Sequence, residues 1–252
     1  MAVMLRRLAQ IGVALTLLSP PASAQSTPPL PKITIGMEQA QGTADVSLSM
    51  QVFLLLTVLS LAPAILLMLT SFTRIVIVLS FARSALGTQQ IPPNSVIMGL
   101  ALFLTAFTMA PVWDAVNTQA VQPYLAHQID YKTALQKASV PIREFMLRQT
   151  REKDLALFVY LSRQPKPAAP SEIPTSVLVP AFMISELKTA FVMGFVMFIP
   201  FLIVDAVVSV VLMSMGMMMV PPMVFSLPFK ILLFVMVDGW HLITRSLALS
   251  FH

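Results

Sequence analysis

Residues 199–230 read IPFLIVDAVVSVVLMSMGMMMVPPMVFSLPFK, and this stretch decides the fold. Asp205 and Lys230 carry its only charges, and every residue between them is uncharged. Gly216 and the dipeptide Pro221-Pro222 lie near its middle, where glycine and proline favour a chain reversal. The stretch therefore predicts two apolar helices joined by a methionine-rich turn.

The rest of the chain has the same apolar character. Of its 252 residues, 57% are hydrophobic and 11% are charged, whereas a soluble domain carries about 25% charged residues. These few polar side chains cannot cover the surface of a water-soluble globule. The composition therefore indicates that the chain lies in a bilayer or an enclosed assembly, and it argues against a soluble enzyme. The absence of cysteine excludes disulfides, thiolate metal sites and cysteine nucleophiles.

Further charge-free tracts extend this pattern over residues 46–73, 84–113 and 189–204. The first two exceed the roughly 20 residues of a spanning helix, so we expect an all-α, membrane-associated fold with four long helices in two hairpins. Prolines in or beside these helices are expected to kink them, and broken backbone in lipid needs protein neighbours. The hairpins should therefore pack against other subunits. The prolines are Pro63, Pro111, Pro180, Pro200 and Pro228.

The N-terminal region predicts export. Residues 1–24 have two arginines, an apolar stretch and a small-residue cleavage site, which is typical of a removed signal peptide. The alternative is an uncleaved anchor, for which the apolar stretch is short. Residues 25–47, rich in proline and glycine, predict an extended tail. Cleavage would remove Arg6 and Arg7 and lower the formal charge from +5 to +3, which argues against nucleic-acid binding.

A polar segment separates the first predicted hairpin, residues 48–117, from the second, residues 177–252. Residues 118–176 hold 8 of the 16 basic and 5 of the 11 acidic residues, so we expect amphipathic helices in water. A cleaved signal and two crossings place this segment in the periplasm, whereas the positive-inside rule favours the cytoplasm. The signal peptide carries more weight, because a loop of about 60 residues is near the length at which its charge no longer determines the orientation of the helices in the membrane.

Two buried ion pairs are predicted. A hairpin that reverses between Asp205 and Lys230 brings both to similar depth, and intramembrane charges usually find partners. We expect them to pair within one protomer or between neighbours; the alternative is separate exposure to an aqueous lumen. Glu186 is expected to meet the basic middle segment, for instance Arg151, although a solvated helix start fits it equally well.

Methionines gather at the turn of the second hairpin. Met217, Met218 and Met219 are consecutive and therefore point in several directions on any secondary structure. Core filling is the ordinary role of methionine, but the prolines that follow end the element at once. A loop tip of flexible apolar side chains fits a deformable seal better than a fixed core.

Motifs for catalysis are missing from the sequence. It contains no H-E-x-x-H motif of zinc proteases, no P-loop motif of nucleotide-binding proteins and no G-x-S-x-G nucleophile elbow with a partnering histidine. We expect no enzymatic activity, no cofactor and no metal site.

Six segments resemble the FliP family of flagellar biosynthesis proteins. They cover much of the chain from residue 48 onward: FARSALGTQQIPPN (81–94), PIREFMLRQTRE (141–152), SELKTAF (185–191), IPFLIVD (199–205), GMMMVPP (216–222) and VDGW (237–240). Injectisome relatives share several of these motifs but tend to lack a signal peptide, so the flagellar branch is preferred.

The resemblance implies a core subunit of the type III export gate in the flagellar basal body of the bacterial inner membrane. Several copies would form a helical channel with FliQ and FliR, next to export proteins such as FlhB and FlhA, and unfolded flagellar proteins would pass through it. Family roles would make Met217, Met218 and Met219 a pore gasket and Phe145 and Phe158 pore-lining residues. Those two phenylalanines are about 220° apart on one continuous helix, so they need separate helices or different roles.

A solute transporter is the competing class. Broken helices around Asp205 and Lys230 could form a midplane binding site, and inverted repeats would favour this reading. The two hairpins share only their length.

Overall fold

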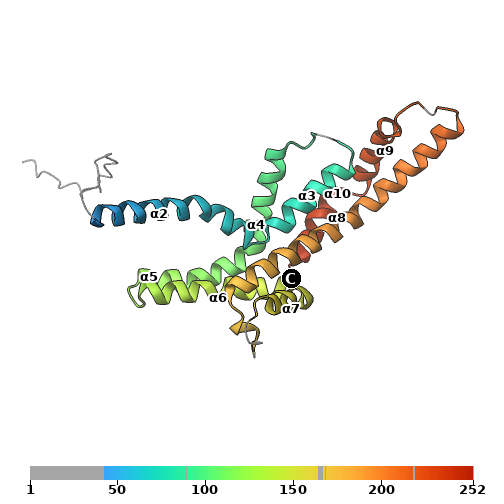
Figure 1. Cartoon of the computed structure of the whole chain (residues 1–252). Coiled ribbons are helices and arrows are strands. Elements are labelled where there is room, and N and C mark those ends of the chain that lie inside the picture. Colours follow the sequence, from blue (N-terminus) through green and yellow to red (C-terminus); the bar gives the residue numbers. More distant parts are fainter. Residues whose placement is uncertain (1–42, 89, 164–166, 168, 218, 252) are drawn as a thin grey trace, which may run out of the picture. The chain divides into compact units, whose positions relative to one another are not determined.

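The computed structural model describes residues 43–88, 90–163, 167, 169–217 and 219–251. The predicted signal peptide and residues 25–42 of the predicted tail lie outside the described residues. All regular secondary structure in the described part is helical, which confirms the all-α fold (Figure 1). The elements are α2 (Thr43–Met68), α3 (Phe72–Ala85), α4 (Asn94–Val116), the π-helix η1 (Asn117–Val121), α5 (Gln122–Leu125), α6 (Tyr131–Gln149), α7 (Glu152–Leu161), the 3₁₀ turn η2 (Pro170–Glu172), α8 (Thr175–Ser214), α9 (Pro222–Met236) and α10 (Gly239–Leu249).

The chain divides into two units, Met1–Gln51 and Val52–His252. The described part of the first unit is the beginning of α2, so the helix starts five residues before the predicted boundary at residue 48. All other elements belong to the second unit.

The predicted first hairpin, residues 48–117, contains three helices, α2, α3 and α4, instead of two. α2 ends at Met68 and α3 begins at Phe72. The Thr70 hydroxyl donates to the Leu67 carbonyl, and the Ser71 hydroxyl bonds with that of Thr108 on α4. Hydroxyls of this kind compete with the helical backbone bonds. The helix that packs most extensively against α4 is α3. The first hairpin therefore consists of α3 and α4, and it is shorter than predicted because α2 is a separate helix.

The prolines of the long helices lie inside them. α8 runs for 40 residues through Pro180 and Pro200, and α4 contains Pro111. A local change of helix type occurs at η1, just before Pro123, which has no N–H to donate. The Gln122 N–H bonds the carbonyl of Asn117, five residues back. The rod then continues into α5.

α8 is the central element of the second unit. It packs along α3, α6, α7 and α9. Two apolar cores result: one joins α3, α4, α8, α9 and α10 around Ile75 and Leu79, and the other joins α4, α6 and α8 around Phe182. Arg143 of α6 holds the entry to α8, donating to the carbonyls of Ser171 (3.2 Å) and Ile173 (2.5 Å).

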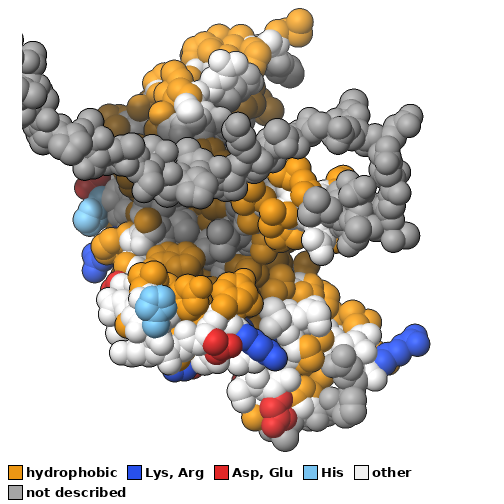
Figure 2. Space-filling view, turned by 90° about the vertical axis from the view of Figure 1, so that its left-hand side faces the viewer, with side chains coloured by type: hydrophobic (Ala, Val, Ile, Leu, Met, Phe, Trp, Pro, Cys, Tyr) orange, Lys and Arg blue, Asp and Glu red, His pale blue; other side chains and the backbone are white. Residues whose placement is uncertain are grey.

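Two helical rods in the described residues, 94–125 and 175–214, are long and apolar enough to cross a membrane. α9 and α10, bent by 61°, add a third if they form one broken span. Large apolar side chains point outward from these rods, for example Phe103 (79% exposed) and Phe107 (69% exposed). Hydrophobic side chains also cover much of the described surface in Figure 2. Such a surface needs lipid or protein around it.

Candidate functional site

The methionine-rich turn lies between α8 and α9. Gly216 has a φ of +78°, the left-handed conformation that glycine adopts most easily. The Met217 N–H bonds the Leu212 carbonyl and the Gly216 N–H bonds the Met213 carbonyl, a Schellman ending of α8. Pro222 then occupies the first position of α9, where its missing N–H costs no helix bond. The sequence thus fixes a sharp reversal where it was predicted.

Methionine side chains at this turn face outward. Met219 is 97% exposed and Met217 is 36% exposed, whereas Met218 lies outside the described residues. Met213, Met215 and Met223 on either side are also exposed. Flexible, polarisable thioethers at an exposed tip can adapt to surfaces of different shape.

Asp205 and Lys230 come together below the turn. The Lys230 Nζ lies 2.6 Å from Asp205 Oδ2, and the Ser226 hydroxyl donates to Asp205 Oδ1 at 2.6 Å. The Lys230 side chain is 4% exposed and that of Asp205 is 28% exposed. The pair therefore forms within one chain, across the α8–α9 hairpin.

Glu186 has a different partner from the one expected. Both of its carboxylate oxygens accept from Arg74 of α3, with 2.9 Å between Arg74 Nε and Glu186 Oε2. Arg151 instead donates to the Thr189 hydroxyl at 3.1 Å. The expected Glu186–Arg151 ion pair is replaced by Glu186–Arg74, because α3 lies against α8 and places Arg74 beside the carboxylate, while Arg151 acts on Glu186 through its charge.

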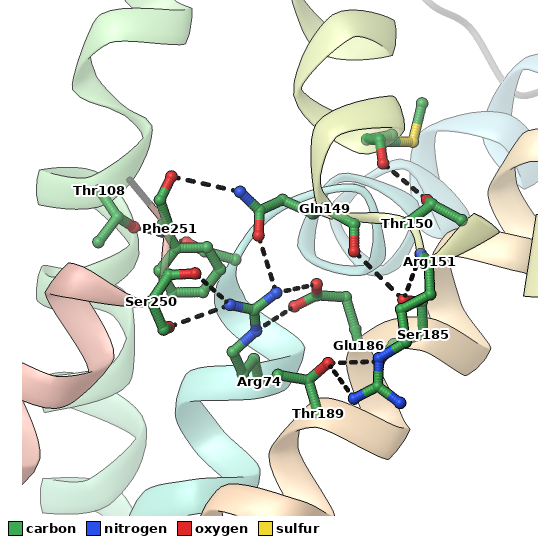
Figure 3. Close-up of polar contacts among 12 residues, drawn as sticks. Arg74, Thr108, Gln149, Thr150, Arg151, Ser185, Glu186, Thr189, Ser250 and Phe251 are labelled. Atoms are coloured by element: carbon green, nitrogen blue, oxygen red, sulfur yellow. Dashed lines mark hydrogen bonds and ion pairs between the residues drawn. The ribbon is translucent and has the colours of Figure 1, made fainter. Parts of the chain in front are cut away.

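Arg74 is the centre of a buried polar cluster, drawn in Figure 3. Besides Glu186, it donates to the Gln149 side chain (3.0 Å) and to the Ser250 carbonyl (2.8 Å) and hydroxyl (3.0 Å). All five guanidinium donors are thereby used, as a buried charge requires. The cluster ties α3, the end of α6, α8 and the residues after α10 together.

Ser185 extends this cluster to the connection between α6 and α7. Its hydroxyl accepts from the Arg151 backbone N–H at 3.0 Å and donates to the Gln149 carbonyl at 3.2 Å. The connection is therefore fixed against α8.

The two predicted pore-lining phenylalanines lie on separate helices. Phe145 of α6 is 2% exposed, and its ring contacts those of Phe182 and Phe251. Phe158 of α7 is half-buried against the same core. A pore-lining role therefore requires Phe145 to leave the packing described here.

Sequence reasoning missed Arg74, Gln149 and the residues after α10. One signal was available: Arg74 is a single charge between the apolar tract 46–73 and the apolar residues that follow it. A lone charge among apolar residues needs a partner. Its partner Glu186 lies 112 residues away, and no local pattern links the two.

Comparison with known proteins agrees with these motifs. The family model described as "FliP family" matches residues 55–247. A flagellar biosynthetic protein FliP of Bacillus subtilis (strain 168) is 58% identical over 207 residues, covering 82% of this chain and 94% of its own length. The FliP of Pectobacterium carotovorum subsp. carotovorum is 52% identical over 246 residues, covering 96% and 92%. The FliP of Caulobacter vibrioides is 55% identical over 197 residues, covering 78% and 74%.

The matched residues include Arg74, Gln149 and Glu186 of the polar cluster, the ion pair between Asp205 and Lys230, and the methionine-rich turn, but not Ser250. The family model matches more than half of the chain. The alignments with the two FliP proteins named first cover most of this chain and most of each relative. This chain belongs to the FliP family.

Proposed function

We propose that this chain is a core subunit of the flagellar type III protein export gate. Several copies form, together with FliQ and FliR, the channel through which unfolded flagellar proteins leave the cell. The subunit guides and seals the passage and performs no chemical step. Separate components and the proton-motive force supply the energy for transport.

The exposed methionine turn is the observation that carries this proposal. Met217 and Met219 project from the tip of two paired apolar helices, fixed by the Schellman ending at Gly216. Copies arranged around an axis would bring these tips together. A ring of flexible apolar side chains can part for chains of different sequence and dewet when it closes.

The exposed apolar surface supports assembly with partners. Side chains on the outer face of α8, such as Phe191 and Phe195, are more than half exposed in the single chain. Their contacts in the assembly would come from further copies, from FliQ and FliR, and from lipid. Other export proteins such as FlhB and FlhA would adjoin the complex.

The proposed location is the bacterial inner membrane within the flagellar basal body. Removal of residues 1–24 would leave the new N-terminus outside the cytoplasm and the polar segment 118–176 in the periplasm. The apolar rods 94–125 and 175–214 are compatible with both a bilayer and a proteinaceous assembly.

The transporter alternative has little support in the geometry. Asp205 and Lys230 satisfy each other, and Ser226 occupies the second carboxylate oxygen. The adjacent groove of about 440 Å³ is lined only by apolar side chains, among them Val208 and Phe225. A solute site needs a few polar groups aimed into the pocket.

Purification from native membranes tests the proposal. A tagged full-length chain should be recovered in a large hetero-oligomer with several copies of itself and two smaller hydrophobic subunits, FliQ and FliR. The Gln149→Ala variant, altered in the polar cluster, should give less complex, whereas Gln136→Ala, at an exposed position of the same helix α6, should serve as the matched control. Recovery as a monomer or dimer that binds a small solute would contradict the gate and favour the transporter.

A further inference from the structure

The residues that follow α10 fold back into the polar cluster. Arg74 Nη1 donates to the Ser250 carbonyl and hydroxyl, and Gln149 Nε2 donates to the Phe251 carbonyl at 3.2 Å. These bonds join α3 and α6 to a segment far away in sequence. Figure 3 shows Ser250 and Phe251 beside the Arg74 guanidinium.

The Phe251 ring links the polar cluster to Phe145. The Arg74 guanidinium carbon lies 4.1 Å from the Phe251 ring centroid, within cation–π range. The same ring stacks on Phe145 with centroids 6.4 Å apart and planes at 28°. Phe145 in turn meets Phe182 of α8 edge-on at 5.9 Å. Phe251 thus covers one side of the Phe145 ring, and the core around Phe182 packs against the rest of that ring.

The attachment of residues 250–251 is light compared with that of α10. Ser250 and Phe251 are both half-buried, and they are held by hydrogen bonds, one cation–π contact, one ring stack and the packing of Phe251 against the two apolar cores. Ile243 and Leu247 of α10 are instead buried members of the core that α10 shares with α3 and α8. Residues 250–251 can therefore detach while α10 stays in that core.

The corner between α9 and α10 is tightly packed. Asp238 lies between these two helices, which are bent by 61°, and has a φ of +50°. Gly239 lies so close to the Phe234 ring that a Cβ would stand 2.2 Å from it, and the Trp240 ring meets the same ring edge-on at 5.3 Å. This corner holds α10 in place, so a release involves only the residues that follow α10.

We propose that Ser250 and Phe251 form a latch that keeps Phe145 inside its own protomer. Bound to Arg74 and Gln149, the latch closes the core over Phe145; released from these two side chains, it uncovers that ring. The latch itself follows from the contacts of the single chain. Only the destination of the uncovered ring, the wall of the export channel, rests on the proposed function.

Cysteine labelling tests the latch, because the natural chain contains no cysteine. Met146 lies next to Phe145 and is 1% exposed, so a Met146→Cys reporter leaves the ring in place. Full-length chain in native membranes is treated with a maleimide, and the rate of modification is measured with and without Phe251→Ala. Loss of the cation–π contact and the ring stack should raise this rate about tenfold. Phe251→Tyr, which keeps the ring, should leave it close to the starting rate.

A second reporter separates release of the latch from unfolding. Ala120 of η1 is 2% exposed and belongs to neither of the two cores that Phe251 packs against, so Ala120→Cys should stay unmodified in the Phe251→Ala chain. An unchanged rate at residue 146 would overturn the proposal. Equal increases at residues 146 and 120 would also overturn it, since Phe251 would then stabilise the whole chain. Purification of the complex measures the gate, whereas the difference between the labelling rates of the two reporters measures the latch, so failure of the latch and failure of the gate are distinguishable.

Discussion

Gly194 of α8 lies directly against the ring of Phe81 on α3, so that a Cβ at residue 194 would stand 2.6 Å from Phe81 Cγ. No real Cβ approaches a carbon atom so closely. The absent side chain of Gly194 therefore sets the distance between the two helices that form the main packing of the second unit.

Gly194→Ala should destabilise the chain by overpacking, by about 1–3 kcal/mol. The measurement is the thermal unfolding midpoint of the detergent-purified protein. Gly99→Ala is the matched control, because nothing lies within 4 Å of a Cβ at residue 99 inside α4. There alanine should raise stability by up to about 1 kcal/mol through helix propensity. A similar rise for Gly194→Ala would show that α3 and α8 do not pack as described.

The contrast between the two ion pairs explains what the sequence could predict. Asp205 and Lys230 lie almost symmetrically about Gly216, so one local reversal is enough to bring them to the same depth. Glu186 finds Arg74 only through the packing of α3 on α8, a long-range relationship that one sequence does not encode as a pattern. The break at Thr70 and Ser71 was missed for a related reason, since two hydroxyls near the end of an apolar tract leave that tract uncharged and long enough for a spanning helix. Phe145 stacks on Phe251, which is again far away along the chain.

Removing Arg74 should strongly destabilise the chain. Arg74→Met leaves the buried Glu186 carboxylate without its counter-charge, which costs about 3–5 kcal/mol. The free energies of unfolding of Arg74→Met, Glu186→Gln and the double variant form a double-mutant cycle. The double variant should lose less stability than the sum of the losses in the two single variants. Strict additivity would mean that the pair contributes no coupling.

Arg83→Met, near the other end of α3, is the control for this cycle. Its guanidinium bonds Asn94 at 3.0 Å in an exposed setting. Its loss should cost no more than about 1 kcal/mol. A loss as large as that for Arg74→Met would mean that burial does not distinguish these two arginines.

Charge reversal tests the pair in the second hairpin. Asp205→Lys and Lys230→Asp each place two like charges side by side at the α8–α9 contact and should reduce the yield of assembled complex. The double swap should restore part of that yield, but not all, because Ser226 donates to a carboxylate at position 205 only. Lys188→Asp, at an exposed position on α8, controls for the change in net charge. If the double swap restores nothing, the interaction is not a pair.

Asp130 should make the stability of α6 depend on pH. It caps the helix by accepting from the Thr133 N–H at 3.3 Å, and hydrogen bonds from the Thr133 hydroxyl and backbone hold the pKa of its carboxyl below the usual value of an aspartate. A lowered folded-state pKa stabilises above the unfolded-state value, and this contribution is lost as the pH falls through the folded-state pKa. Asp130→Asn keeps a capping oxygen without the titration. The difference in unfolding midpoint between the two chains should therefore shrink as the pH is lowered below about 4; a constant difference would contradict the cap.

The methionine turn should control leakage through the assembled gate. Replacing Met217, Met218 and Met219 together by alanine removes flexible apolar volume from an exposed tip and keeps the backbone N–H of residue 217 that bonds the Leu212 carbonyl in the Schellman ending. A ring of alanines closes less completely than a ring of thioethers, so water and small ions should pass when no substrate is present. The measurement is the ion conductance of the reconstituted complex, or the ion leak of cells that produce it. Met213→Ala, exposed on α8 before the turn, should leave conductance unchanged. Equal conductance in the triple variant and the natural complex would place the seal elsewhere, because the turn is the proposed point of closure.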